Sequence, residues 1–377
     1  MSETRGERTS RLGYFLALVL IVAGVGGTAP AATKTFDGGA SGTGVAWNTA
    51  TNWVGDSLPT TSDEILIDNS VLATLPNPFT TQSLTVGAVI FDTNNTTGVA
   101  VNESGTTNRT MTLSGGGGSS AAIAAGGATG DLIVLGTNAT TNTVTVGGNL
   151  GAGTGGLILK FAATGNINVV NSGATLVLNL NSFGTDNNCT GLTKTGNGTL
   201  VLESSSTELG NYAAFTGLTI TAGTLKLGAA NRIATKPILL AGGTLHTGGF
   251  NETVGTLQLL NHSVIDLGAG ASVLNFSASS GVSWTSGKIL EILNWSGAQA
   301  GGGTDQLKIG SNDTGLTADQ LSQIRFVNPT GLDSGTYFAS QLSTGEVVPG
   351  ALIPEPASVG LLGLGAVGCL VRRSRRK

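Results

Sequence analysis

A short unit of the form Gly-Thr-Leu-x-Leu, with small variations, recurs through the middle of the chain and limits the folds available to it. Successive copies are 24, 25, 20 and 12 residues apart, with leucines at Leu176, Leu200, Leu225, Leu245 and Leu257. The unit puts apolar side chains at positions i and i+2, on one face of an extended strand. A single unit cannot bury that face, but stacked units share a continuous core. The repeat therefore predicts a β-solenoid.

The body of the chain, residues 81–287, alternates short apolar runs with turns of Gly, Asn and Thr. Runs of this kind lie at 111–113, 132–135 and 144–146. They are typical of strands bounded by turns, whereas the i, i+3, i+4 pattern of an amphipathic helix is almost absent. With 60 glycines and 11% charged residues in 377, the composition favours strands and tight turns over disorder. We predict an all-β protein.

Residues 191–228 match a known repeat in three places. They contain Lys194-Thr-Gly-Asn-Gly-Thr-Leu200, then Tyr212, then Ala222-Gly-Thr-Leu225. This segment resembles the autotransporter-associated β-strand repeat, although its middle is longer than the family pattern. The resemblance implies a right-handed parallel β-helix. At roughly 22 residues per coil, the body has length for about ten coils.

The first 32 residues have the three parts of a signal peptide. Arg5, Arg8 and Arg11 supply the positive start, and an apolar run of about 14 residues follows at 12–25. The small residues that end the segment predict cleavage after Ala31 or Ala32. An uncleaved membrane anchor is the alternative, but the apolar run is shorter than the ~20 residues that span a bilayer.

The last segment, residues 353–377, has three parts. Ile353 is followed by Pro354-Glu355-Pro356, and an apolar stretch follows at 357–371. The segment ends in basic residues, including Arg372, Arg373, Arg375 and Arg376. This order resembles the PEP-CTERM sorting signal of Gram-negative bacteria. The resemblance implies that an exosortase-type enzyme recognises and processes the tail. The positive-inside rule predicts a transmembrane sorting helix with its arginines in the cytoplasm. The alternative is an ordinary C-terminal anchor.

Two flanking segments are expected to cap the solenoid. Residues 33–80 contain Trp47 and Trp53, and residues 288–350 contain a capping-box pattern at Thr317 and Gln320 that predicts a short helix. Both segments resemble the ends of PEP-CTERM proteins with β-repeats. Caps are needed because an open solenoid end exposes its core and its strand edges.

The charge distribution excludes nucleic acid as a partner. The whole chain has a formal net charge of −4, but residues 32–353 hold 10 basic and 19 acidic residues, a net of −9. Proteins that bind nucleic acid neutralise phosphates with Lys and Arg. The two cysteines of the chain are too few for a disulfide framework.

The sequence contains no recognisable catalytic or metal-binding set. His246 and His262 have no cysteine or carboxylate at metal-ligand spacing, and there is no Gly-x-Ser-x-Gly motif. Asp63, Glu64 and Asp68 form a tight acidic group, but they lie in the first predicted cap. We therefore predict no catalytic residue, no metal site and no cofactor.

The remaining polar positions are expected to be structural or solvated. The segments 92–98 and 312–315 resemble calcium loops only weakly, since neither has the glycine at position six and the distal glutamate of such loops. Cys189 is expected to be an inert turn residue. Four basic residues of the repeat region are expected to lie on solvated strand or turn positions: Lys194, Lys226, Arg232 and Lys236.

Together these features predict a non-enzymatic, exported structural protein of the cell surface or extracellular matrix. Family resemblance implies association with exopolysaccharide, and contact with the membrane through the C-terminal helix before processing. One alternative is a glycan-binding or adhesion module, in which Trp47 and Trp53 stack on sugars. Another is a polysaccharide-degrading β-helix enzyme, which would need converging carboxylates.

Overall fold

The computed structural model describes residues 32–354, except for 41–43, 45, 70–75, 80–82, 95–99, 104–107, 117, 119, 150–155, 181, 186–187, 204–214 and 234. All of these residues belong to the second of two units, Ala31–Lys377. The predicted signal peptide up to Ala31 and the predicted sorting segment from Glu355 onward lie outside the described residues.

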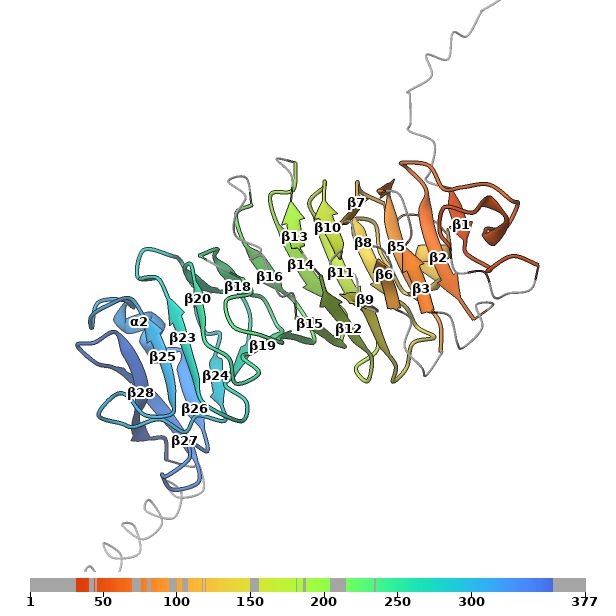
Figure 1. Cartoon of the computed structure of the whole chain (residues 1–377). Helices are drawn as coiled ribbons and strands as arrows, with labels where there is room; N and C mark the ends of the chain where they lie inside the picture. The colour runs from red at the N-terminus through yellow and green to blue at the C-terminus, as the bar shows by residue number, and fades with distance from the viewer. Residues whose placement is uncertain are drawn as a thin grey trace, which may run out of the picture. The chain divides into compact units, whose positions relative to one another are not determined.

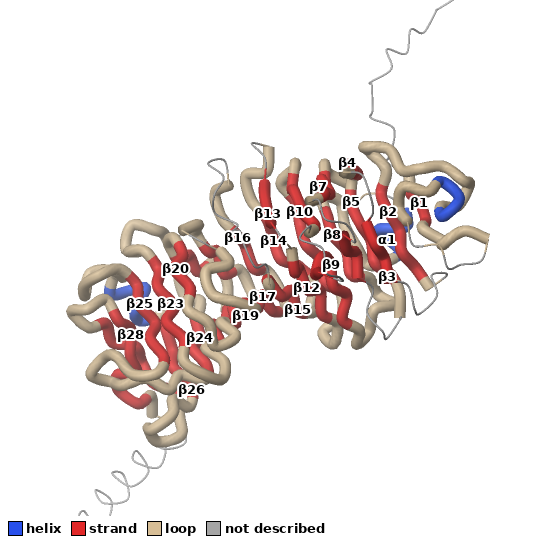
Figure 2. Tube along the Cα trace, viewed as in Figure 1, coloured by secondary structure: helices blue, strands red, loops and turns tan. Residues whose placement is uncertain are grey.

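The described residues are nearly all β, with long parallel sheets and few helices (Figure 2). The short helical elements are a 3-10 turn η1 (Ala50–Asn52) and the helices α1 (Ser120–Ala124) and α2 (Ala318–Ser322). A nine-stranded sheet contains β1 (Thr33–Thr35), β2 (Glu64–Asp68), β5 (Ala88–Asp92), β8 (Asp131–Leu135), β11 (Gly165–Val169), β14 (Leu192–Thr195), β16 (Leu218–Ile220), β18 (Ile238–Leu240) and β21 (Leu257–Leu259).

Two further sheets complete the described fold. A four-stranded sheet has the order β13 (Ser182–Thr185), β10 (Leu157–Phe161), β7 (Arg109–Leu113) and β4 (Leu84–Val86). A fifteen-stranded sheet has the order β20 (Glu252–Val254), β23 (Ser272–Phe276), β25 (Asp305–Ile309), β28 (Glu346–Leu352), β27 (Thr336–Gln341), β26 (Ile324–Val327), β24 (Leu290–Leu293), β22 (Ser263–Asp266), β19 (Thr244–His246), β17 (Thr224–Leu227), β15 (Thr199–Leu202), β12 (Thr175–Asn179), β9 (Thr143–Asn149), β6 (Ala100–Glu103) and β3 (Pro76–Phe79).

The chain visits the sheets in turn, so that strands distant in sequence pair in parallel. From β5 to β13 each coil adds one strand to the nine-stranded, the fifteen-stranded and the four-stranded sheet in that order (Figure 1). Among the described strand pairs only β25–β28, β26–β27 and β27–β28 are antiparallel. This arrangement is consistent with the predicted β-solenoid.

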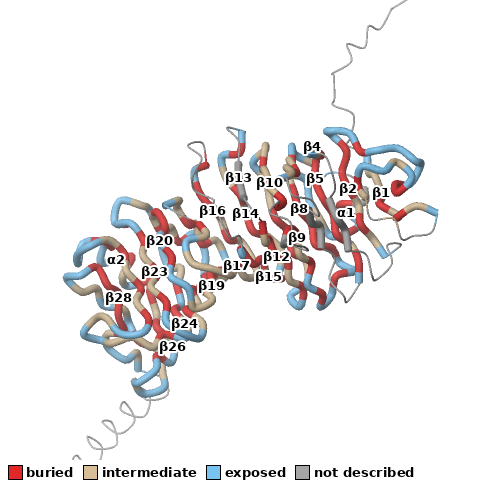
Figure 3. Tube along the Cα trace, viewed as in Figure 1, coloured by how far each residue is buried: buried red, intermediate tan, exposed pale blue. Residues whose placement is uncertain are grey.

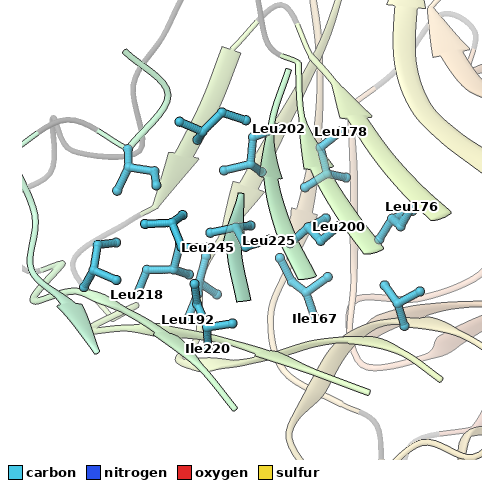
Figure 4. Packing of buried hydrophobic residues seen from close by; sticks show 14 of the residues in the cluster. Ile167, Leu176, Leu178, Leu192, Leu200, Leu202, Leu218, Ile220, Leu225 and Leu245 are labelled. Carbon is cyan, nitrogen blue, oxygen red and sulfur yellow. The ribbon is translucent and has the colours of Figure 1, made fainter. Parts of the chain in front are cut away.

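The leucine repeat forms the core between the sheets. Leu176, Leu200, Leu225 and Leu245 are paired in register on β12, β15, β17 and β19, and all are buried. They point towards apolar side chains of the nine-stranded sheet, among them Leu218 (Figure 4). Loops and turns carry most of the exposed positions (Figure 3). Full burial of one such leucine stabilises the fold by about 1.5–3 kcal/mol.

The last copy of the repeat, at Leu257, does not continue the leucine stack that the sequence predicts. Leu257 lies on β21 and pairs with Ile238 in the nine-stranded sheet. The residue that continues the leucine stack after Leu245 is Ile265, on β22. The spacing of 12 residues is shorter than a coil, because Leu257 opens the next coil on a different sheet.

The first strand is covered by an aromatic segment. Phe36 and Trp53 form an isolated antiparallel bridge, and the Val54 amide donates to the Thr35 carbonyl at 3.0 Å. This chain therefore runs beside the edge of β1, and an edge that is covered in this way is protected from pairing with another chain. The predicted cap, residues 33–80, also contributes strands β1, β2 and β3 to the sheets.

At the other end, a hairpin joins two parallel ladders into one sheet. β26 and β25 are the last strands of these ladders, and the antiparallel pair β27–β28 bridges them. Because both ladders end on a partner strand, neither leaves an open edge here. The predicted capping box at Thr317 and Gln320 is confirmed, and α2 follows it. The helix ends at Ser322, and β26 begins two residues later at Ile324.

Candidate functional site

Trp47 and Trp53 lie inside the molecule, with exposed fractions of 3% and 0%. Their rings are edge-to-face at 5.7 Å, and Phe36 packs against both. The Trp53 indole N–H donates to the Trp47 carbonyl at 2.9 Å. Neither ring presents a face to solvent, so the sugar-stacking interpretation of this pair does not fit the structure. Three mutually packed aromatic rings bury a large apolar area instead.

The two histidines occupy separate structural positions. The His246 Nε2 lies 3.9 Å from Asp266 Oδ2 on the next strand, and its Nδ1 accepts from the Gly248 amide. The His262 Nδ1 accepts a hydrogen bond from the Ile289 amide at 3.1 Å. Among the residues that the structure describes, no group of three or more His, Cys, Asp or Glu side chains is placed to hold a metal ion.

Several carboxylates are buried, which the sequence did not indicate. Asp305 accepts four hydrogen bonds, from the amides and hydroxyls of Ser272 and Ser296. Glu252 accepts from the amides of Arg232 and Ile233 in an adjacent turn. These carboxylates tie neighbouring turns together. Their oxygens are occupied by backbone amides and serine hydroxyls, which indicates a structural role.

Lys194 was expected on a solvated position, but it is completely buried, with an exposed fraction of 0%. Its Nζ donates to the carbonyls of Thr195 at 2.6 Å, Gly196 at 2.9 Å and Ala222 at 3.3 Å. Burial lowers the pKa of the Lys194 ammonium from 10.5 to about 7. The available signal was the alternation of β14, where Leu192 and Lys194 stand at i and i+2 and therefore face the same side.

Lys194 joins two consecutive coils. Thr195 and Gly196 follow it in its own turn, whereas Ala222 belongs to the turn of the next coil. Its backbone pairs with Ile167 and Ile220 in the stack of the nine-stranded sheet. The amine thus donates to backbone carbonyls of two neighbouring turns, which offsets part of the cost of burying it.

The two weak calcium-loop candidates also have structural roles at the positions described. Asp92 accepts hydrogen bonds from the backbone amide and side-chain amide of Asn138. Asn312 accepts from the backbone amide and hydroxyl of Thr314, which closes a local turn. Cys189 is buried with its thiol directed at the Gly191 carbonyl, at 3.7 Å.

The described chain ends directly at the predicted sorting motif. Leu352, the last residue of β28, pairs with Tyr337 on β27. The Ile353 amide donates to the Thr336 carbonyl at 2.8 Å, and the next residue, Pro354, is exposed. A single residue therefore separates the last strand from the Pro354-Glu355-Pro356 motif. Glu355, Pro356 and the four arginines of the tail lie outside the described residues, as does the cleavage position at Ala31.

Comparison with known families gives one match. The model of the PEP-CTERM protein-sorting motif matches residues 352–377. This match confirms the predicted tail and implies an exported protein with a membrane-anchored C-terminal sorting signal that an exosortase processes. No curated protein and no solved structure matches the chain. No helix within the described part of the chain has the length and apolar character needed to cross a membrane.

Proposed function

We propose that the protein is a non-enzymatic structural component of the cell surface or extracellular matrix, associated with exopolysaccharide. The main observation that supports the proposal is that the last strand of the β-structure leads almost directly into the sorting motif. A folded body that ends one residue before the motif is delivered to its destination with almost no linker. The body is a right-handed parallel β-helix, and residues 191–228 belong to the autotransporter-associated repeats.

Export follows from the two ends of the chain in this proposal. The signal peptide, residues 1–32, directs the chain across the inner membrane and is removed after Ala31 or Ala32. The apolar stretch 357–371 then holds the chain in the membrane as a helix until the exosortase acts. The described carboxylates of Asp305 and Glu252 support the non-enzymatic role, because their oxygens accept structural hydrogen bonds.

Cell fractionation of the producing bacterium tests this proposal. The expected result is that the protein is recovered outside the inner membrane, together with the polysaccharide fraction. A variant with Pro354→Ala, Glu355→Ala and Pro356→Ala should accumulate unprocessed in the inner membrane. The matched control is Ala351→Ser, which changes an exposed residue before the motif and should leave sorting unchanged. Stable full-length protein in the cytoplasm would refute the proposal.

A further inference from the structure

A surface groove of about 670 Å³ lies near the last coils. One wall is the loop 280–289, and the other wall contains the segment 317–325, which includes α2. The volume falls within the range of about 300–1,000 Å³ that is typical of small-ligand sites. The sugar-stacking pair predicted from the sequence, Trp47 and Trp53, does not line this groove.

Buried amides fix the two walls to each other. Gln320 and Gln323 are exposed by only 4% and 9%. The Gln320 amide donates to the carbonyls of Ser279 and Val282 at 3.0 and 2.7 Å. The Gln323 amide donates to the carbonyls of Thr285 and Lys288, both at 2.8 Å. The loop is thus held open before any ligand binds, which lowers the entropic cost of binding.

Trp284 lines the groove and is only partly buried. Its indole N–H donates to the Leu257 carbonyl at 2.9 Å, which fixes the orientation of the ring. The other three tryptophans of the chain, all within the described residues, are buried. Trp284 packs against the core on one side and lines the groove with the part that stays accessible. The groove therefore has an aromatic lining residue of fixed orientation next to polar groups.

The polar groups around Trp284 favour a neutral, hydroxyl-rich ligand. Hydroxyls of several serines line the groove, and the charged lining consists of Lys288, Asp319 and Arg325. Charges of both signs can hydrogen-bond to sugar hydroxyls, which donate and accept. Two cations against one anion leave the charged lining close to balanced, without the cluster of basic side chains that holds a polyanion. The net charge of −9 over residues 32–353 adds a weak, salt-screened repulsion. A purely apolar ligand would leave these polar groups without partners.

We propose that this groove binds a short stretch of neutral hexopyranose chain, with a sugar ring packed on Trp284 and its hydroxyls bound by the lining serines and charged groups. The inference rests on the proposed association with exopolysaccharide and assigns the site that makes the contact. The apolar C–H face of a pyranose ring packs on the indole because this contact removes both surfaces from water.

Calorimetric titration of the mature protein, recovered from the producing cells, with cellohexaose tests the assignment. Wild type should bind, and binding should shield Trp284 fluorescence from acrylamide. Trp284→Ala should weaken binding by about two- to tenfold, the size expected for loss of an aromatic stacking contact. Trp284→Phe keeps an aromatic face but loses the indole N–H that orients it, and its affinity should lie between those of wild type and Trp284→Ala. Lys34→Gln, which changes a half-buried residue of the first strand β1 that does not line the groove, is the control and should bind as wild type does.

The outcomes separate this inference from the proposed function. Absence of binding by a protein that reaches the cell surface would overturn the groove assignment and leave the proposed function standing. Equal affinity of wild type and Trp284→Ala would also overturn it. Binding of a galacturonate hexamer in place of cellohexaose would overturn the proposal that the ligand is neutral. Retention of wild type in the cytoplasm would refute the proposed function whatever the groove binds.

Discussion

At the scale of single residues, Lys194 is the most unusual position of the ladder. Removing an ammonium group from water costs free energy of desolvation. The hydrogen bonds from Lys194 to three backbone carbonyls offset only part of that cost. Lysine is almost never fully buried, and the sequence predicts a solvated position for Lys194. The alternation of β14, with Leu192 two residues earlier, is the local signal that indicates its inward direction.

The lowered pKa of Lys194 predicts that stability increases with pH. The unfolded chain holds this proton up to a pKa near 10.4, whereas the folded chain releases it at about 7. Between these values the unfolded state binds more protons, so the free energy of unfolding rises as the pH increases from about 7 towards 10. The gain is on the order of 5 kcal/mol as an upper limit. Below pH 7 both states hold the proton and this contribution stays constant.

Urea unfolding at a series of pH values between 6.5 and 10 measures this effect. The comparison is with Lys194→Met, which keeps an unbranched side chain of similar length but has no titrating group. Wild type should show the steeper rise of stability with pH. An identical pH dependence in both proteins would show that Lys194 does not titrate in this range.

At the scale of elements, the leucine ladder and the turns between coils determine the register. Side chains at the inner positions of β17 are buried, whereas Lys226 between them points outward. The period of two along each strand made these inner positions predictable from the sequence. A period of two does not tell which of the sheets a strand joins. The sequence therefore assigns Leu257 to the leucine stack, whereas it lies on β21 of the nine-stranded sheet.

Truncation of an inner leucine should therefore destabilise the ladder much more than truncation of its outer neighbour. Leu225→Ala removes a fully buried side chain and should lower the free energy of unfolding by about 2–5 kcal/mol. Lys226→Ala changes the next residue on the same strand and should cost within about 0.5 kcal/mol. Equal losses in urea unfolding would contradict the assigned inner and outer faces.

The stacked turns should be just as sensitive at one glycine. Gly223 has φ +60°, and a Cβ there would lie 2.4 Å from the Gly198 carbonyl oxygen and 2.5 Å from that of Gly196. Gly223→Ala should therefore destabilise the protein by more than about 1 kcal/mol, because both the backbone strain and the clash with the neighbouring turn oppose it. Gly281→Ala, where a Cβ meets open space, is the matched control. Similar melting temperatures for the two variants would argue against close stacking of the turns.

At the scale of the whole molecule, repetition is what made the fold predictable. Repeated leucines specify parallel stacking, so an all-β ladder followed from the sequence. The closing hairpin could not be predicted in this way. Its strands β27 and β28 pair with each other and with the last coils in antiparallel fashion, and no repeated sequence pattern indicates this pairing. The groove beside Trp284 was equally hidden, since its walls at 280–289 and 317–325 meet only after the ends of the coils are packed.

The proposed destination of the molecule rests on the two ends of the chain, of which the C-terminal one matches a known sorting motif. The sorting motif was identified from residue order alone, and the family match to residues 352–377 confirms it. The structure adds that β28 leads directly into this motif. The sorting motif therefore begins one residue after the last strand ends.

Intact mass and terminal sequencing of the protein recovered from the producing bacterium examine export and processing together. The expected mature chain begins at Ala32 or Thr33 and lacks the arginines at 372–376. A recovered protein that starts at Met1 and retains Lys377 would contradict both the signal peptide and the exosortase-dependent sorting.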